Sequence, residues 1–223
     1  GWSVSLSSDG TILAIGGEGG GDNNSGHVKV YKYNGSSWNQ LGENIDGEAD
    51  DDYSGYSVSL SSDGTIVAIG AYDNYGNNGT DSGHVRVYQY SNSSWNQLGQ
   101  DIDGEAGGDR SGWSVSLSSD GTIVAIGATR NDGNGTNSGN VRVYQYRKFT
   151  DADVDNYNYG NFTQDTNQTK PIIVTNTQPS VDNYYWFQLG QDIDGEVSGD
   201  DSGILVSLSS DGYTVAIGAY RND

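Results

Sequence analysis

The chain of 223 residues contains no cysteine, so it has no disulfide, no thiol nucleophile and no cysteine-ligated metal. No apolar run reaches about 18 residues, which excludes a membrane-spanning helix in this segment. Apolar residues nowhere follow a helical spacing over a long window, so the sequence predicts no helix. Basic residues are few, with 10 Lys and Arg against 30 Asp and Glu. The resulting net charge of −20 repels nucleic-acid phosphates, so no nucleic-acid partner is expected.

The chain repeats itself. The string SVSLSSDGTI occurs almost unchanged from Ser3, Ser57 and Ser114, and a fourth copy, VSLSSDGYTVAIGA, begins at Val206. Each copy holds short runs rich in Val, Ile and Tyr between Gly, Asn, Asp and Ser, a pattern typical of strands and turns. TIVAIGA is apolar almost throughout and predicts a strand buried on both faces, whereas the alternating GHVRVYQY predicts a half-exposed strand. We therefore expect four antiparallel strands per copy.

Such repeats predict an all-β fold, a β-propeller of four-stranded antiparallel blades, with about three and a half blades in this segment. A closed propeller has about four to eight blades, so the segment is expected to belong to a longer chain and not to close alone. The expected blades cover residues 1–54, 55–111, 112–202 and, in part, 203–223.

Two stretches carry a family resemblance: Gly112 to Ala128 read GWSVSLSSDGTIVAIGA, and Gly139 to Tyr146 read GNVRVYQY. This pattern resembles the FG-GAP repeat of integrin-α-type propellers, over nearly the whole chain except one insertion. The resemblance implies an extracellular seven-bladed propeller used in adhesion or ligand binding. Family members often bind calcium in an Asp-rich loop between strands that match SVSLSS and TIVAIGA.

Here the corresponding loop is only Ser-Ser-Asp-Gly-Thr. One carboxylate cannot supply the roughly six to eight oxygens that calcium prefers. Asp-Gly is also a strong hairpin signal, because tight turns need positive backbone angles. We therefore interpret the aspartates of this loop as turn residues and not as calcium ligands: Asp9, Asp63, Asp120 and Asp211.

A second set of acids lies on the links between blades. The candidate metal ligands are four acids within nine residues, Asp101, Asp103, Glu105 and Asp109. Closely spaced carboxylates can chelate a hard cation, so calcium is the one possible cofactor. The alternative is that Asp-Gly forms a turn while the other acids face water, and the spacing matches no established cation loop. The same theme recurs in the other links, at Asp46, Glu48, Asp50 to Asp52, Asp192, Asp194, Glu196, Asp200 and Asp201.

Candidates for catalysis are few. The two histidines, His27 and His84, share one position of the third strand, where the next copy has Asn140. A position set by the repeat register favours a blade surface over a general base. The serines lack a His–Asp arrangement, and carboxylate pairs recur in every copy, which argues against one acid/base site. The chain is therefore expected not to be an enzyme.

Two sets of aromatic residues recur in register. They begin the first predicted strand and the fourth, and large rings at such positions favour packing between blades. If they are exposed, they would instead form stacking platforms for carbohydrate. The residues are Trp2, Tyr56 and Trp113, and Trp38, Trp95 and Trp186.

Seven Asn-x-Ser/Thr sequons lie outside the predicted strands, which favours exposed N-linked glycans on a secreted protein. Asn34 and Asn92 share one turn of successive blades, and Asn78 and Asn134 share another. The alternative is that these residues serve only as turn formers. The full set is Asn23, Asn34, Asn78, Asn92, Asn134, Asn161 and Asn167.

One insertion, at about residues 147–185, separates the third and fourth strands of the third blade and holds both prolines. Ile172, Ile173 and Val174 predict an extra strand, which we interpret as an interaction segment. Apolar side chains left in water are costly, so Lys170 to Thr177 is expected to pair with or pack on a neighbouring blade or chain. The alternative is a tolerated loop.

These features favour an extracellular structural or adhesion repeat glycoprotein, a scaffold of a cell surface or surface appendage. Its expected partners are other protein subunits of that assembly. The alternative is a lectin-like module that binds carbohydrate. An enzyme would need catalytic residues outside this segment.

Overall fold

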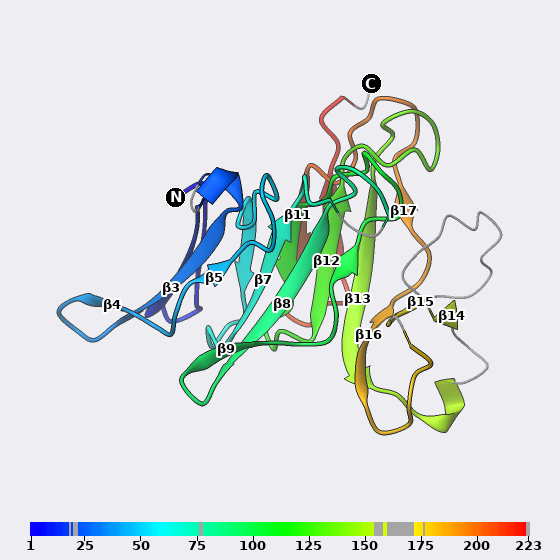
Figure 1. Cartoon of the computed structure of the whole chain (residues 1–223). Coiled ribbons are helices and arrows are strands. Elements are labelled where there is room, and N and C mark those ends of the chain that lie inside the picture. Colours follow the sequence, from blue (N-terminus) through cyan, green and yellow to red (C-terminus); the bar gives the residue numbers. More distant parts are fainter. Residues whose placement is uncertain are drawn as a thin grey trace.

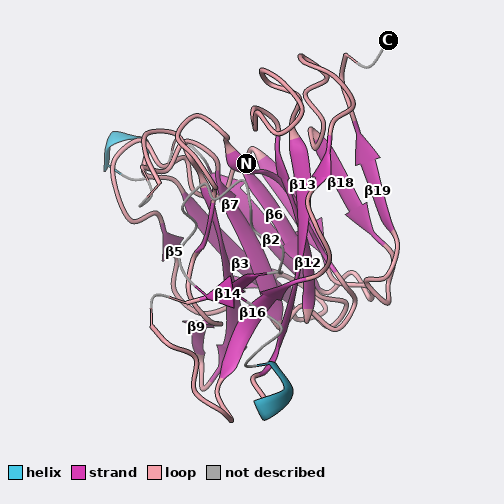
Figure 2. Cartoon of the chain, turned by 90° about the vertical axis from the view of Figure 1, so that its right-hand side faces the viewer, coloured by secondary structure: helices cyan, strands magenta, loops and turns pink. Residues whose placement is uncertain are grey.

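The computed structural model describes residues 1–17, 19, 22–75, 78–153, 158–159, 172–175 and 177–221, and strands dominate it (Figures 1 and 2). Helix in these residues is limited to two three-residue 3₁₀ turns, Asp22–Asn24 and Asp151–Asp153. No described helix is long and apolar enough to cross a membrane. The predicted all-β class is confirmed.

Each copy of the repeat forms its own antiparallel sheet, and the sheets follow one another in chain order (Figure 1). The first blade contains β1 (Ser3–Leu6), β2 (Ile12–Gly17), β3 (His27–Tyr33), β4 (Trp38–Gln40) and β5 (Ile45–Asp46). The second contains β6 (Ser57–Leu60), β7 (Ile66–Ala71), β8 (His84–Ser91), β9 (Ser94–Gln97) and β10 (Ile102–Asp103).

The third blade contains β11 (Ser111–Leu117), β12 (Ile123–Ala128), β13 (Asn140–Lys148), β16 (Tyr184–Gln188) and β17 (Ile193–Asp194). Its insertion adds β14 (Asn158–Tyr159) and β15 (Ile172–Val174). The fourth sheet consists of β18 (Leu205–Leu208) and β19 (Val215–Gly218). The propeller blade architecture that the repeat predicts is thus present.

The outer edge of each complete blade differs from the prediction in one respect. β4 and β5 both pair with β3, β4 along its end and β5 along its start. The fourth strand is therefore interrupted, and its second half is the Ile-Asp pair that the sequence analysis assigned to the link. Because this pair belongs to the sheet, its two side chains point to opposite faces. Ile102 is fully buried in the apolar core.

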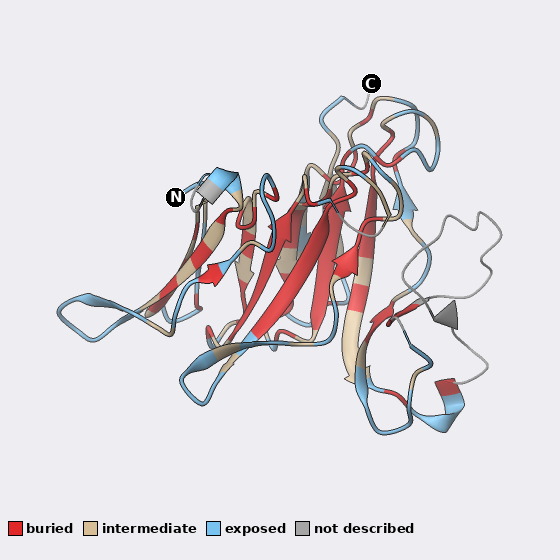
Figure 3. Cartoon of the chain, in the orientation of Figure 1, coloured by how far each residue is buried: buried red, intermediate tan, exposed pale blue. Residues whose placement is uncertain are grey.

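The core lies between successive blades. Ala14, Val28 and Val30 of the first blade pack against Val58 and Ile69 of the second, and a matching cluster joins the second blade to the third. β7 and β12 are buried along their whole length, as predicted for TIVAIGA (Figure 3). β8 was expected to be half exposed, but its first five residues are buried. The polar positions of this strand face the junction with the preceding blade, which the alternation alone cannot reveal.

The repeated serines of SVSLSS join neighbouring blades. Ser57 Oγ donates to the Gly112 carbonyl at 2.8 Å, and the Leu117 amide donates to Ser59 Oγ at 3.0 Å. The same contacts recur at the other junctions. Adjacent blades therefore share hydrogen bonds as well as an apolar core.

The Asp-Gly segments form the predicted turns. Around Asp63, the Ser61 hydroxyl donates to Oδ1 at 2.7 Å and the Thr65 amide donates to the same oxygen at 2.9 Å. Of the two central residues, only Gly64 has a positive φ, of 70°. The aspartate therefore contributes hydrogen bonds, and the glycine allows the backbone conformation. The Asp-Gly pairs of the other three copies have the same two roles.

Candidate functional site

The four acids singled out on the second link do not converge on one point. Asp109 is 4% exposed, and its Oδ2 accepts hydrogen bonds from the Ala106 amide and from Asn131 Nδ2. Burial raises the pKa of Asp109. Asp103 is buried as well, in β10. The alternative in which the acids outside the Asp-Gly pair face water is therefore wrong for Asp109, because the link folds back onto the next blade.

Asp101 instead belongs to a polar cluster at the junction of the first two blades. Ligand-type atoms of Glu48, His84 and Asp101 all lie within 4.8 Å of one another. Arg86 borders them, with Nη1 3.3 Å from Glu48 Oε1 and Nη2 donating to the Asp46 carbonyl at 3.0 Å. His84 was expected on the blade surface, and that is wrong, since the Glu48 link of the preceding blade covers it.

The next junction holds the same arrangement with one substitution. Glu105 lies near Arg142, whose Nη2 donates to the Asp103 carbonyl at 3.1 Å. Asn140 takes the place of the histidine, and its Nδ2 donates to Asp192 Oδ2 at 3.5 Å. Burial raises the pKa of Asp192 to about 6, while Arg142 opposes the rise. Glu105 is thus a member of this second cluster and not a partner of Asp101.

The tryptophans of the fourth strand pack between blades as expected. Trp95 Nε1 donates to the Leu41 carbonyl of the first blade at 2.8 Å, and Trp186 Nε1 donates to the Leu98 carbonyl of the second at 2.7 Å. Trp38 has no described blade before it and is 43% exposed.

The aromatic residues that begin the first strands form a row across three blades. The Trp2 and Tyr56 ring centroids are 5.6 Å apart, and those of Tyr56 and Trp113 are 4.8 Å apart. Tyr72 lies against both Tyr56 and Trp113, and Arg110 sits over the Tyr72 ring at 5.5 Å. These five side chains are exposed or partly exposed, so the row combines packing with an accessible aromatic surface.

The sequons differ in their surroundings. Asn34 and Asn92 are exposed in hairpin turns, as is Asn23 after β2. Asn78 Nδ2 instead donates to the Gly104 carbonyl at 2.7 Å, and Asn134 Nδ2 to the Gly195 carbonyl at 3.0 Å. These two amides therefore hold neighbouring links, a role that the sequence did not reveal. Asn161 and Asn167 lie outside the described residues.

The apolar segment of the insertion forms the predicted extra strand. β15, which includes Ile172, pairs with β16 of its own blade, with Ile173 opposite Phe187. Ile173 packs with Phe149 and Phe187, and Val174 enters the core between the second and third blades. The pairing thus differs from the expected contact with a neighbouring blade or chain, whereas Val174 does pack against a neighbouring blade. Lys170 itself lies outside the described residues.

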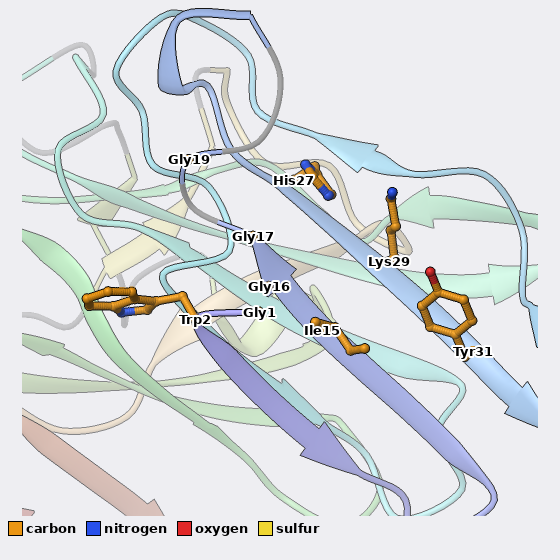
Figure 4. A pocket seen from close by; sticks show the side chains of 9 residues that line it. All are labelled: Gly1, Trp2, Ile15, Gly16, Gly17, Gly19, His27, Lys29 and Tyr31. Carbon is orange, nitrogen blue, oxygen red and sulfur yellow. The ribbon is translucent and has the colours of Figure 1, made fainter. Parts of the chain in front are cut away.

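The first blade exposes a face that the inner blades bury. Val4 and Leu6 are 66% and 56% exposed, whereas the equivalent Val58 and Leu60 are 9% and 8% exposed beneath the preceding blade. Beside them, Ile15, His27, Lys29 and Tyr31 help to line a hollow of about 440 Å³. Figure 4 shows the last three side chains along β3, at the register positions of His84, Arg86 and Tyr88.

The fourth sheet exposes the opposite face. Ala216 of β19 is exposed, although its equivalents in the other three blades are fully or almost fully buried against the following blade. Leu205 is 70% exposed. The described array therefore ends in two different faces, each of the kind that packs against another blade.

Comparison with protein families agrees with the repeat. Residues 102–144, from β10 through most of β13, match the FG-GAP repeat family. The chain contains an FG-GAP repeat there, and the resemblance seen in the sequence is confirmed. No curated protein matches the chain.

Several solved structures are similar in fold. Hydrazine synthase from Kuenenia stuttgartiensis has a TM-score of 0.50 at 14% identity, over 99% of this chain and 58% of that one. Periplasmic gluconolactonase from Pseudomonas aeruginosa has a TM-score of 0.44 at 17% identity, over 96% of this chain and 64% of that one. A candidate 6-phosphogluconolactonase from Bacteroides uniformis has a TM-score of 0.41 at 15% identity, over 64% of this chain and 36% of that one. This chain thus spans less than two thirds of each, and at these identities the likeness shows the fold alone.

The expectation that the chain is not an enzyme is contradicted, because its fold also occurs in enzymes, hydrazine synthase among them. The repeat fold alone does not exclude catalysis, since active-site residues can lie on loops that do not follow the repeat.

Proposed function

We propose that this chain is a scaffold of an extracellular surface assembly, a structural or adhesion repeat glycoprotein that joins other protein subunits. The observation that supports the proposal is the array of like blades, which contains an FG-GAP repeat at residues 102–144. In this array one blade binds the next through an apolar face, and Val58 and Leu60 are only 9% and 8% exposed beneath the preceding blade. Burying one such side chain is worth about 1.5 to 3 kcal/mol.

The open face of the first blade, which exposes Val4 and Leu6, fits a blade of the same type. In the second blade, Arg86 of the corresponding face pairs with Glu48 on the link of the preceding blade. Lys29 holds that position on the open face, beside the hollow. An acidic link of the same kind would therefore meet a positive charge there, on a chain whose net charge is otherwise −20.

An extracellular location is supported by the sequons. Asn34 and Asn92 lie on exposed hairpin turns, where N-linked glycans of secreted proteins are found.

The test is the association of the chain in solution, followed by sedimentation velocity over a range of concentrations. Leu6→Asp places a charge on the open face, and Val181→Asp is the control, because Val181 is an exposed apolar residue in the insertion. The wild type and Val181→Asp should associate, and Leu6→Asp should stay monomeric. A monomeric wild type, or a Leu6→Asp variant that associates normally, contradicts the proposal.

A lectin-like role is the second candidate, favoured by the aromatic row of Trp2, Tyr56 and Trp113. Exposed rings at this spacing can stack on sugar faces. A glycan array decides it: binding that Trp113→Ala removes supports the role, and an array without hits removes it.

A further inference from the structure

The junction between the first two blades brings together three metal-ligand side chains from distant parts of the chain. Glu48 lies on the link after β5, His84 begins β8, and Asp101 precedes β10. One ligand-type atom from each lies within 4.8 Å of those from the other two. Two different blades therefore contribute to one cluster.

The histidine in this cluster is buried with a polar atom unused. His84 is 1% exposed, and its Nε2 has no hydrogen-bond partner among the described residues. An unpaired buried nitrogen costs free energy, so a ligand that engages it stabilises the fold.

We propose that Glu48, His84 and Asp101 form a binding site for a divalent transition-metal ion of the Zn²⁺ class, which links the first blade to the second. One imidazole nitrogen with two carboxylates suits Zn²⁺, whereas calcium and magnesium prefer oxygen ligands alone. Three protein ligands leave a fourth position for water.

The geometry needs only a small adjustment. Ligands of a tetrahedral Zn²⁺ lie about 3.4 Å apart when each is about 2.1 Å from the ion. The Glu48 side chain is 47% exposed, so it is the member that can move inward. Arg86 contacts Glu48 Oε1, and the second carboxylate oxygen can serve an ion. Asp101 Oδ1 accepts a hydrogen bond from Gln97 Nε2 at 2.7 Å, which orients the carboxylate.

The next junction is an internal comparison for this site. Glu105, Arg142 and Asp192 repeat the glutamate, arginine and aspartate, but Asn140 replaces the histidine and donates to Asp192. The fold therefore accepts asparagine at this register among the same neighbours. Among the junctions that the described residues form, the first alone has an imidazole, so this nitrogen ligand is specific to it.

The experiment measures Zn²⁺ binding to the metal-free chain by equilibrium dialysis, together with the thermal midpoint of unfolding. The wild type should bind one equivalent tightly and unfold at a higher temperature with Zn²⁺. His84→Asn should weaken this binding by more than about tenfold and remove the thermal shift. His27→Asn changes the other histidine, on the open face, and should keep both.

If His84→Asn fails to fold, Asp101→Asn takes its place, since the first blade has Asn44 at that position. No tight equivalent in the wild type would overturn the proposal, and so would equal binding by the His84 or Asp101 variant. Zn²⁺ binding and its thermal shift are measured without any partner, so their failure would not count against the proposed scaffold function, nor its failure against them.

Discussion

Replacing Gly70 with alanine should force the second and third blades apart. Gly70 lies near the end of β7, and a Cβ at this position would fall well inside van der Waals contact with the Gly112 carbonyl oxygen and with Ser57 Oγ. The same oxygen accepts the Ser57 hydroxyl hydrogen bond across the junction. Neither atom can yield without disturbing the contact between the blades.

Overpacking of this kind costs about 1 to 3 kcal/mol, and loss of the Ser57 hydrogen bond adds about 1 kcal/mol. Alanine recovers up to about 1 kcal/mol relative to glycine in a strand. The free energy of unfolding should therefore fall by about 1 to 4 kcal/mol. Urea unfolding followed by tryptophan fluorescence measures the change.

Gly218→Ala is the matched control. Gly218 holds the same position in β19, where no described blade follows, and the nearest atom to its Cβ would be the Leu205 Cβ at 3.5 Å. This variant should change the free energy of unfolding by less than about 1 kcal/mol. A Gly70→Ala variant as stable as Gly218→Ala would refute the close approach of blades as the reason for the glycine.

Three further predictions concern single side chains. Because the pKa of Asp192 is raised to about 6 from 3.8, its stabilising effect is full below pH 3.8 and is lost as the pH rises through 6. The stability of the wild type relative to Asp192→Asn should thus fall by up to about 3 kcal/mol between pH 4 and pH 7 in urea titrations. Trp95→Phe loses the hydrogen bond to Leu41 and should lower stability by about 1 kcal/mol more than Trp38→Phe, by the same assay. After secretion from a eukaryotic host, glycosidase treatment should lower the mass, and Asn34→Gln and Asn92→Gln should each remove part of that loss; an unchanged mass would argue against glycans.

Local features of the fold could be predicted from the sequence. The Asp63-Gly64 turn depends on contacts within a few residues, and the burial of Ile66–Ala71 follows from a run without polar residues. Because the copies are nearly identical, each local prediction applies to every blade. The packing of Trp95 between blades could also be predicted, because a tryptophan recurs at the same position of each complete blade.

Features that depend on distant partners could not be predicted. Asp109 is buried where its link folds back onto the next blade, and its carboxylate accepts a hydrogen bond from Asn131, 22 residues away. His84 meets Glu48 of the preceding blade, and no spacing rule links these two positions. The strand pattern gives the serines of SVSLSS no distant partner, yet Ser57 Oγ donates to the Gly112 carbonyl, 55 residues away. Their repetition in every copy was the signal that could have revealed this role.

The central claim is that like blades bind one another through these faces, so that the first face of the array, at Leu6, is complementary to the last, at Ala216. Leu6→Asp disables the first face and leaves Ala216 intact, and Ala216→Asp does the reverse. Sedimentation velocity of each variant alone should show monomers, while an equimolar mixture should form a dimer and nothing larger. A mixture that stays monomeric while the wild type associates, or variants that assemble alone, would contradict the claim.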